Sequence, residues 1–325
     1  MKKLTSKTLR ENLPGYAFML PGFIFIAVYM AYPLIETLYL SFTQYNMAFD
    51  AEPTWLGFGN YIAMFKDKHF VTALKNTAVF SAGFFPSVMV LSLIVAMLLD
   101  KGVRCSAFFR TCIFVPVVVP LSLTGIIFQW ILNEKYGLLN WFLTDILNMG
   151  WMAQNWLADK TWAMVSIIVV SVWKNMGMLV IMFMAGLQAI PNDIIEASRI
   201  DGATTMQRIT KIILPNLKES FVICGIWAII QSVKVFEQPF IMTNGGPGDA
   251  TMVLYQYTWM NAFKYMELGY ASSIAYFMGL IILILSYFNM RANRSDEEKE
   301  KEELRKLARR EAREEKRMRK KEVNV

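Results

Sequence analysis

The chain has 325 residues, of which 55% are hydrophobic, and its mean hydropathy is +0.36. This balance excludes an ordinary soluble globular protein and indicates a membrane protein. The net charge of +7 does not indicate a nucleic-acid partner, because the basic residues gather beside apolar runs, the distribution that sets membrane topology. One histidine and three cysteines are too few for a metal cluster or a disulfide framework, so we expect Cys105, Cys112 and Cys224 to be small core residues.

Residues 1–13 form a basic N-terminus ahead of an apolar run that extends from about residue 16 to 39. A secretory signal peptide begins in the same way, but its apolar core is only about 7–15 residues long and ends in a cleavage site of small residues. We therefore expect this run to remain as the first membrane helix. Pro21 and Pro33 lie inside it and can kink it.

Five further apolar runs follow, each near the roughly 20 residues that cross a bilayer, at residues 77–99, 107–132, 163–187, 221–242 and 268–290. The sequence thus predicts an all-α membrane protein whose transmembrane domain, residues 14–290, has six transmembrane helices. Lysine and arginine are concentrated at the N-terminus, after the second span and between the fourth and fifth spans. By the positive-inside rule, both termini and the segment between spans four and five lie in the cytoplasm.

The long connections on the opposite side are rich in aromatic residues, namely Trp55, Tyr61, Phe65 and Phe70 in residues 43–70, and Trp141, Trp151 and Trp156 in residues 137–159. Two interpretations remain open. Tryptophan and tyrosine gather in belts at the membrane–water interface, and the same side chains could instead contact a partner protein.

Ionisable side chains lie inside two of the predicted spans, where lipid makes charge costly. Lys174 is near the middle of the fourth span, and Lys234 and Glu237 are in the outer half of the fifth. Such groups usually face a bundle interior or a water-filled path. Lys234 and Glu237 are also three residues apart, so they could instead neutralise each other on one helical face.

Residues 191–217, between the fourth and fifth spans, are too polar to cross lipid. Asn192 or Asp193 can cap a first short helix, and Gly202 is placed to end that helix in a left-handed conformation.

Thr204 opens a second helix, since Thr204 and Gln207 have the spacing of a capping box. Pro215 is expected to stop this helix because it has no N–H. The product is a compact helix–turn–helix knob, part of which must be covered by protein because its apolar surface exceeds what a free loop needs.

This segment resembles the EAA loop of the permease subunits of bacterial ABC importers, with the pattern E-A-A-x3-G-x9-I-x-L-P. The matching positions are Glu196, Ala197, Ser198, Gly202, Ile212, Leu214 and Pro215. The only departure is Ser198 in place of the second alanine, and serine is small enough for the same close packing. The alternative is an ordinary cytoplasmic loop between membrane helices.

Residues 243–251, TNGGPGDAT, form a glycine-rich run after the fifth span. Because no Lys-Ser or Lys-Thr follows it and no strand precedes it, it is not a P-loop, and we expect an external turn. It is similar to the T-x-G-G-P-x3-T segment of permease subunits for carbohydrates, such as those for maltose and glycerol phosphate. The pieces MLPGF, YPLIETLYLSFTQYN and SVWKNMG also resemble that subgroup, and the likeness covers about residues 16–290.

The resemblance implies that residues 191–217, from here on the coupling loop, sit in a groove of a cytoplasmic ATPase dimer. Glu196 would offer a charged contact, Gly202 would permit the tight turn, and Leu214 and Pro215 would fix where the second helix meets the next span. The resemblance further implies a second permease subunit, expected to be a different polypeptide, an extracytoplasmic solute-binding protein, and a location in the bacterial cytoplasmic membrane.

We expect no enzymatic activity and no cofactor in this chain, because the sequence has neither a Walker-type G-x4-G-K-[ST] segment nor a nucleophile constellation. ATP and Mg²⁺ would be bound by the partner ATPase. An ion-coupled secondary transporter is a rival class, but it would use intramembrane carboxylates and internal repeats, of which this chain shows one carboxylate and no repeat. A receptor or scaffold would leave the coupling loop unexplained.

The expected substrate is a mono- or oligosaccharide, with glycerol phosphate or another polar solute as the alternative. Side chains of the right chemical type for contact with a sugar along the transport path are Trp173, Lys174, Asn175, Gln231 and Glu237. The tail, residues 291–325, mixes many basic and acidic side chains, which predicts a solvated, partly helical cytoplasmic extension. Contact of the tail with anionic headgroups or with the ATPase is the alternative.

Overall fold

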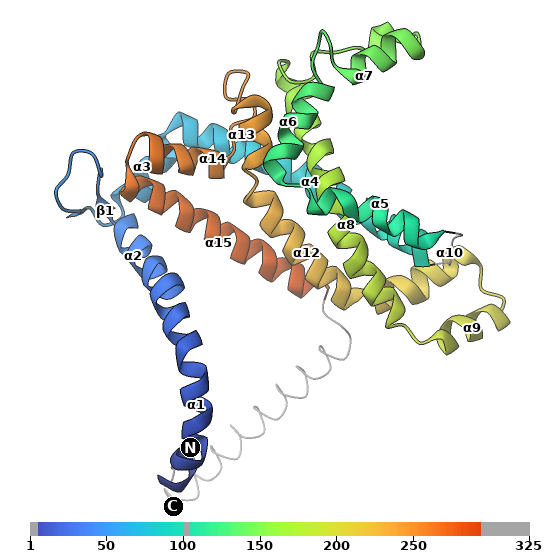
Figure 1. Ribbon diagram of the computed structural model, residues 1–325, viewed down its shortest axis with the longest axis horizontal. Helices are drawn as coiled ribbons and strands as arrows, with labels where there is room; N and C mark the ends of the chain where they lie inside the picture. The colour runs from blue at the N-terminus through green and yellow to red at the C-terminus, as the bar shows by residue number, and fades with distance from the viewer. Residues whose placement is uncertain (1–5, 101–104, 294–325) are drawn as a thin grey trace, which may run out of the picture. The chain divides into compact units, whose positions relative to one another are not determined.

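The structure, a computed structural model, describes residues 6–100 and 105–293 (Figure 1). Residues 294–325 of the predicted tail 291–325, and the basic residues before Ser6, therefore lie outside the described part of the chain. Two compact units can be distinguished. One is formed by Met1–Ala73 with Leu254–Leu280, and the other by Leu74–Val253 with Ile281–Val325.

The first unit is helical apart from one short hairpin. Its helices are α1 (Ser6–Ile26), the π-helical turn η1 (Ala27–Ala31), α2 (Tyr32–Ser41), α3 (Gly59–Lys66), α14 (Leu254–Trp259), the π-helical turn η5 (Met260–Lys264) and the first half of α15 (Leu268–Ala292). Strands β1 (Thr43–Gln44) and β2 (Thr54–Trp55) pair antiparallel. The hairpin lies directly on α15, since a Cβ added at Gly269 would be 2.2 Å from the carbonyl oxygen of Thr43.

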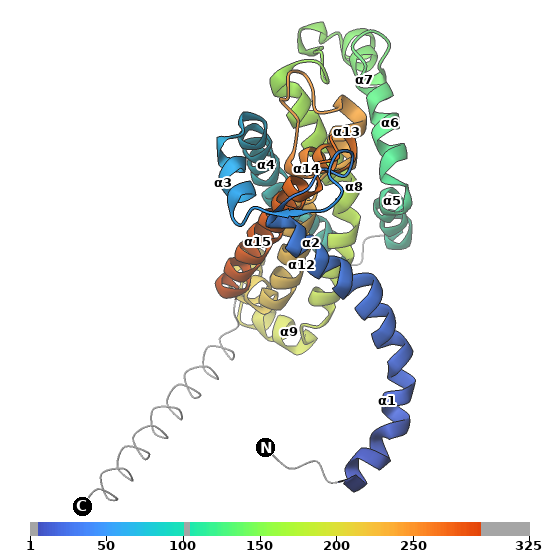
Figure 2. The ribbon, with the colours of Figure 1, turned by 90° about the vertical axis from the view of Figure 1, so that its left-hand side faces the viewer.

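The second unit contains α4 (Lys68–Asp100), which starts in the first unit, α5 (Ser106–Val118), α6 (Leu121–Ile131), α7 (Leu138–Trp141), η2 (Phe142–Ile146), η3 (Gly150–Met152) and α8 (Lys160–Gln188). It continues with α9 (Asn192–Ile200), α10 (Thr205–Arg208), η4 (Ile209–Ile213), α11 (Leu214–Asn216), α12 (Lys218–Val233) and α13 (Glu237–Thr243). Its core lies between α4, α8 and α12, where Phe80, Phe183 and Cys224 are fully or almost fully buried. Figure 2 shows α5, α6 and α7 following one another along one side of α8.

Within residues 6–100 and 105–293, five helical segments are long and apolar enough to cross a membrane: Gly15–Ser41, Lys68–Asp100, Lys160–Gln188, Lys218–Thr243 and Leu268–Ala292. The predicted number of six is reached when α5 and α6 count as one broken span. The 18-residue apolar window of the first segment has no buried residue, whereas Ser41 at the end of the segment is buried. The helix of this segment widens into the π-helical turn η1 just before Pro33. The wider turn accommodates the backbone N–H donor that is missing at Pro33.

The third and fifth spans are broken helices, which we did not predict from the sequence. Helices α5 and α6 meet at an angle of 100°, and Val119 between them is extended. Pro120 cannot continue the α5 hydrogen-bond ladder because it has no N–H. The fifth span breaks between α12 and α13, where Phe236 leaves the helical conformation with φ −143° and ψ −56°.

Asp67, between α3 and α4, is the polar centre of the first unit. Tyr257 of α14 and Tyr270 of α15 both donate to its Oδ2, Tyr270 at 2.8 Å, and the backbone N–H of His69 donates to its Oδ1 at 2.9 Å. Burial alone would raise the pKa of Asp67, but these donors outweigh burial and lower the pKa below its usual value. Burial and the facing carboxylate raise the pKa of Tyr257.

Several side chains lie elsewhere than the sequence indicated. All three cysteines are free, but only Cys224 is buried, so the expectation of a core position is wrong for Cys105 and Cys112. Phe70 is fully buried and packs against Phe65, so it is not an interfacial residue. Trp156 packs against the core of the second unit.

Candidate functional site

The coupling loop begins with α9, directly after α8 (Figure 1). The prediction that Asn192 or Asp193 caps this helix is wrong. Pro191 occupies the N-cap position without a side-chain hydrogen bond, and helix α9 already includes Asn192. Pro191 presets the backbone angle at the helix start, and Asp193 falls in the first turn, where its negative charge is favourable to the helix dipole.

The turn after α9 confirms the role predicted for Gly202. Its φ is +76°, in the left-handed region. The N–H of Gly202 bonds to the carbonyl of Arg199 at 3.1 Å, and the N–H of Ala203 bonds to the carbonyl of Ser198 at 3.0 Å. This pair of bonds is a Schellman motif, which satisfies the last carbonyls of a helix. The chain therefore reverses at a fixed point.

Helix α10 starts with the predicted capping box. The Thr204 hydroxyl accepts from the N–H of Gln207, and the Gln207 side chain accepts from the N–H of Thr204. The prediction that Pro215 ends this helix is wrong. The chain widens into η4, continues through α11 with Pro215 in its first turn, and leaves the helical conformation only at Leu217. The wider turn accommodates the proline ring.

One side of the coupling loop is held by the second unit. Ile195 and Ile213 pack against the core, and Leu217 is fully buried at the base. Ser198 is also buried, and its hydroxyl donates to the carbonyl of Ile195 at 2.6 Å. A Cβ added at Gly186 of α8 would be 3.0 Å from the Leu217 side chain, so α8 and α12 converge beneath the loop.

The other side of the coupling loop is uncovered. Ile200 is 87% exposed and Met206 is 69% exposed, and Glu196, Ala197 and Gly202 are exposed as well. A rigid, capped turn that presents apolar side chains beside a carboxylate is suited to enter a groove of another protein. Whether the seven residues of the EAA pattern contact an ATPase stays a prediction.

Lys174 of α8 has a well-defined structural environment. It is 5% exposed, and its Nζ donates to the carbonyls of Pro116, Val117 at 3.0 Å and Val119 at 2.6 Å. In a continuous helix, the carbonyl of Pro116 would accept from the N–H of residue 120, but Pro120 has none. The ammonium thus supplies the donors that the broken span lacks, and a positive charge is favourable at the C-terminus of α5.

Three of the five predicted pathway residues share one small cavity. Asn175, Gln231 and Glu237 line a space of about 20 Å³, which is room for about one water molecule. Ser171 and Leu121 line it too, so it lies between the breaks of the third and fifth spans. Trp173 is on a different side of α8, where it packs edge-on against Phe128 at 5.2 Å. The contribution of these residues to transport stays a prediction.

The break of the fifth span also changes the interpretation of Lys234 and Glu237. Lys234 ends α12 and Glu237 begins α13. The two residues are therefore not on one face of one helix. The interpretation as a structural pair that neutralises its own charge required that arrangement. Both line the small cavity described above.

The glycine-rich run 243–251 is a turn, as predicted. Asn244, Gly245, Gly248 and Asp249 have positive φ values. The hydroxyls of Thr243 and Thr251 lie 2.6 Å apart and close the turn. These two threonines are the ends of the T-x-G-G-P-x3-T segment, so its spacing is explained by one hydrogen bond.

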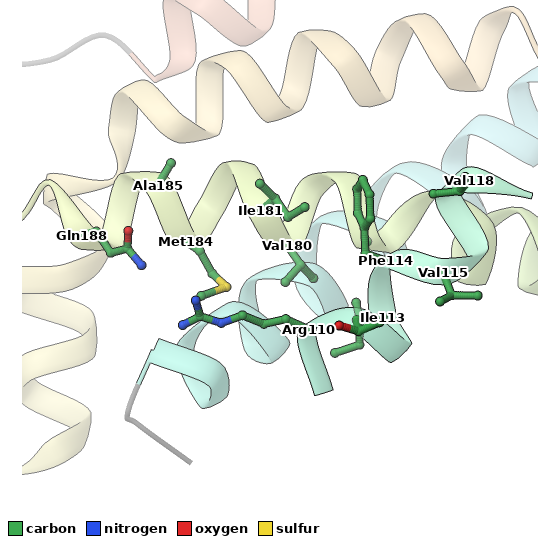
Figure 3. Close-up of a pocket in the computed structure, with 12 residues that line it drawn as sticks. Arg110, Ile113, Phe114, Val115, Val118, Val180, Ile181, Met184, Ala185 and Gln188 are labelled. Atoms are coloured by element: carbon green, nitrogen blue, oxygen red, sulfur yellow. The ribbon is translucent and has the colours of Figure 1, made fainter. Parts of the chain in front are cut away.

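Two larger hollows were missed by sequence reasoning. An apolar groove of about 610 Å³ lies between α5 and α8. Figure 3 shows Arg110 reaching along it towards Met184, with Gln188 at the same end and Val118 at the other. The two helices come closest at its Gly177 wall, where an added Cβ would be 2.3 Å from the carbonyl oxygen of Ile113.

The second hollow is an open cleft of about 600 Å³ at the far ends of α6 and α13. Most of the residues that line it are polar, among them Gln129, Asn133, Glu134, Lys135, Asn155 and Asn244. No spacing in the sequence could reveal it, because it is assembled from three connections that are distant along the chain.

Comparison with known proteins identifies the family. Residues 88–294 match the family described as the inner membrane component of binding-protein-dependent transport systems. The chain belongs to this family. It is thus an all-α membrane permease subunit, and the matched range includes the coupling loop, both broken spans and most of the residues that line the small cavity.

Several curated relatives cover most of the chain. A probable ABC transporter permease protein, YurN of Bacillus subtilis, is 34% identical over 87% of this chain and 96% of its own length. The trehalose/maltose transport system permease protein MalF of Thermococcus litoralis is 31% identical over 87% of this chain and 94% of its own. A chain of the same fold occurs in the crystal structure of a bacterial alginate ABC transporter in complex with an alginate pentasaccharide-bound periplasmic protein. The TM-score is 0.75 and the identity 21%, and the match covers 89% of this chain and 98% of that one.

Proposed function

We propose that this chain is one of two permease subunits of a binding-protein-dependent ABC importer that moves a sugar across the bacterial cytoplasmic membrane. The observation that carries the proposal is the coupling loop, which is folded, capped at both helices and uncovered on one side. Relatives of this chain are named as permeases for trehalose or maltose, lactose and sulfoquinovosyl glycerol, which supports a carbohydrate over another polar solute.

Energy enters through the coupling loop. ATP and Mg²⁺ are held by a separate cytoplasmic ATPase pair, because this sequence contains no Walker-type segment. Closing of that pair pushes on α9, and the push reaches the spans because Leu217 and Gly186 join α8 to α12 at the base of the loop. The chain itself catalyses no reaction.

A second permease subunit completes the transport path. The apolar window of the first span has no buried residue, and the groove between α5 and α8 is open. Apolar surface of this extent in a membrane protein is covered by lipid or by another subunit. Because the ATPases work as a pair and this chain supplies one coupling loop, a partner with its own loop is required, and we propose a different polypeptide.

The orientation follows from charge. Arg199, Arg208, Lys211 and Lys218 lie in or beside the coupling loop, so this end of the bundle faces the cytoplasm together with both termini. The polar cleft of Gln129, Glu134 and Asn155 then opens on the outside, where the solute-binding protein delivers the sugar. The transport path passes Asn175, Gln231 and Glu237, whose side chains can hydrogen-bond sugar hydroxyls.

The proposal is tested by reconstituting the chain with its co-purifying subunits in lipid vesicles and measuring sugar uptake. Uptake should require ATP on the side of the coupling loop and the solute-binding protein on the other side, and should persist when ionophores collapse ion gradients. Uptake that needs an ion gradient and no ATP would instead establish a secondary transporter. Competition among sugars, glycerol phosphate and other polar solutes for the binding protein identifies the substrate.

A further inference from the structure

The connection between α6 and α8, residues 132–159 and from here on the excursion, folds into a closed loop that the proposed function does not use. Asn140 holds it together, because its Nδ2 donates to the carbonyls of Glu134 and Gln154, both at 3.0 Å, and its Oδ1 accepts from the indole N–H of Trp156 at 2.7 Å. Asn140 is buried. Residues 134–156 are thus tied at their two ends, and the side chains between them are presented in fixed positions.

The two faces of this excursion differ. Leu139 packs against the core of the second unit, and Leu143, four residues later, lies on the same side of the helical turns. The other face carries large apolar side chains that are exposed: Leu138, Trp141, Phe142, Ile146, Leu147 and Trp151, from here on the aromatic patch. Trp151 is 76% exposed. Scattered exposed apolar residues need no explanation, but a contiguous and rigid set indicates a surface that something covers.

The aromatic patch continues an apolar stripe on α6. Leu123, Ile126, Ile127 and Trp130 are exposed and recur at helical spacing, while Thr124 and Gly125 on the opposite side are buried. Gly125 lies against Ile241 of α13. Because α6 is half of a membrane span, its exposed stripe lies in the membrane. Figure 2 shows α7 beyond the end of α6 that is away from α5.

Charge and residue type favour a lipid surface as the occupant. Between residues 138 and 152, Asp145 is the one charged side chain, whereas the docking surface of a polar soluble protein would need complementary charges or hydrogen-bonding groups at its rim. Tryptophan, phenylalanine and leucine on a single face at the end of a span are typical of segments that lie in the headgroup region.

We propose that the aromatic patch is an interfacial membrane anchor, which inserts into the headgroup region of the leaflet opposite the coupling loop and fixes the depth of α6 in the bilayer. A fixed depth gives the broken third span a stationary outer half while the coupling loop moves the inner end. This inference uses the family's membrane location and is independent of the solute transported.

The test places single nitroxide labels on the complete transporter in vesicles of phosphatidylethanolamine and phosphatidylglycerol. Cys105, Cys112 and Cys224 are replaced by alanine, and labels are attached at Ile146→Cys and Trp151→Cys. Ala158→Cys is the matched control, because Ala158 is exposed in the same excursion but lines the polar cleft. Collision rates with oxygen, which concentrates in lipid, and with a water-soluble nickel chelate report the depth of each label.

The ratio of oxygen to nickel collisions should be several-fold higher at residues 146 and 151 than at 158, with and without the solute-binding protein. If the nickel chelate reaches all three labels, and loses access to residues 146 and 151 only when the solute-binding protein is added, the proposal is overturned in favour of protein docking. Labels at 146 and 151 that neither reagent reaches would overturn it in favour of the second permease subunit. As a check without cysteine replacement, Trp151→Phe should reduce the fraction of tryptophan fluorescence that brominated phospholipids quench, and an unchanged fraction would contradict the anchor.

Discussion

Replacing Lys174 by methionine tests whether the buried ammonium holds the broken third span. Methionine keeps an unbranched apolar side chain of similar length but has no donor. The carbonyls of Pro116, Val117 and Val119 would then lose the group to which they are hydrogen-bonded. Since the helical partner of Pro116 would be the missing N–H of Pro120, the first of these carbonyls has no alternative within α5.

The size of the effect follows from the number of acceptors. A buried acceptor left unsatisfied costs about 1–3 kcal/mol. Two of the three carbonyls lie at the break, where rearrangement or a water molecule can relieve part of the loss, so we expect Lys174→Met to lower the free energy of unfolding by about 3 kcal/mol in total. A loss of that size lowers Tm by several degrees. We also expect altered transport or altered pairing with the second subunit, because the break positions α6.

The assay is thermal unfolding of the purified transporter, with Lys234→Met as the matched control. Lys234 is a lysine at the break of the other span, but it is exposed, so its loss should change stability by less than about 0.5 kcal/mol. If both variants melt together with the wild-type chain, the three carbonyls do not depend on Lys174 and the reasoning is refuted. If Lys174→Met is stable but inactive, the residue acts in transport and not in holding the break.

Three further predictions follow from single positions. Gly202→Pro should abolish uptake and ATPase docking while membrane insertion is retained. Gly202→Asn should keep most uptake, because no atom lies within 4 Å of an added Cβ and asparagine tolerates the left-handed conformation. Equal uptake by both variants would show that the turn is not needed. Because Asp67 has a lowered pKa, its contribution to the free energy of unfolding should be complete at any pH above the ordinary pKa of aspartate and should be lost only as the pH falls below that pKa. The stability difference between wild type and Asp67→Asn should therefore be constant at neutral pH and shrink in acid. A difference that vanished near neutral pH would contradict the hydrogen bonds from the two tyrosines. Removing residues 295–325 should leave uptake nearly unchanged, and loss of assembly on truncation would show that the tail has a structural role.

Local signals in the sequence predicted local structure well. The capping box of Thr204 and Gln207 and the left-handed Gly202 depend only on residues within one turn, so residue type and spacing are sufficient to find them. The apolar runs located the spans for a similar reason, since a stretch of about 20 apolar residues has few alternatives to crossing a membrane.

The breaks inside the spans and the end of the coupling loop were not predicted correctly, and packing with other residues decides each of them. The break at Pro120 is stable because Lys174, distant along the chain, supplies donors to three carbonyls. The break before Glu237 has a signal in Pro239, which has no N–H to bond the carbonyl of Val235, but a proline inside a membrane helix can equally give only a kink. Pro215 does not stop its helix, because a widened turn accommodates it and hydrophobic anchoring by Leu217 decides where the helix ends.

The same limit applied to the candidate site. The residue types predicted for the transport path were chosen by chemistry, and three of them, Asn175, Gln231 and Glu237, do line one cavity. Helix geometry alone separates Trp173 from Ser171 and Asn175, because residues two apart do not share a helical face, but no pattern in the sequence indicated which face would line the cavity. The polar cleft was also not predictable, because its lining comes from separate connections whose proximity is set by the packing of α6 on α13.

The most direct measurement of ATPase coupling compares two equally exposed apolar residues, one inside and one outside the coupling loop. Ile200 of the coupling loop and Phe49 of the β1–β2 connection are each 87% exposed. Each is replaced by aspartate, and the amount of ATPase that co-purifies with the chain is measured together with ATP-driven uptake. Ile200→Asp should lose the ATPase and the uptake, while Phe49→Asp should retain the ATPase. Retention of the ATPase and of uptake by Ile200→Asp would contradict the assignment of residues 191–217 as the coupling loop.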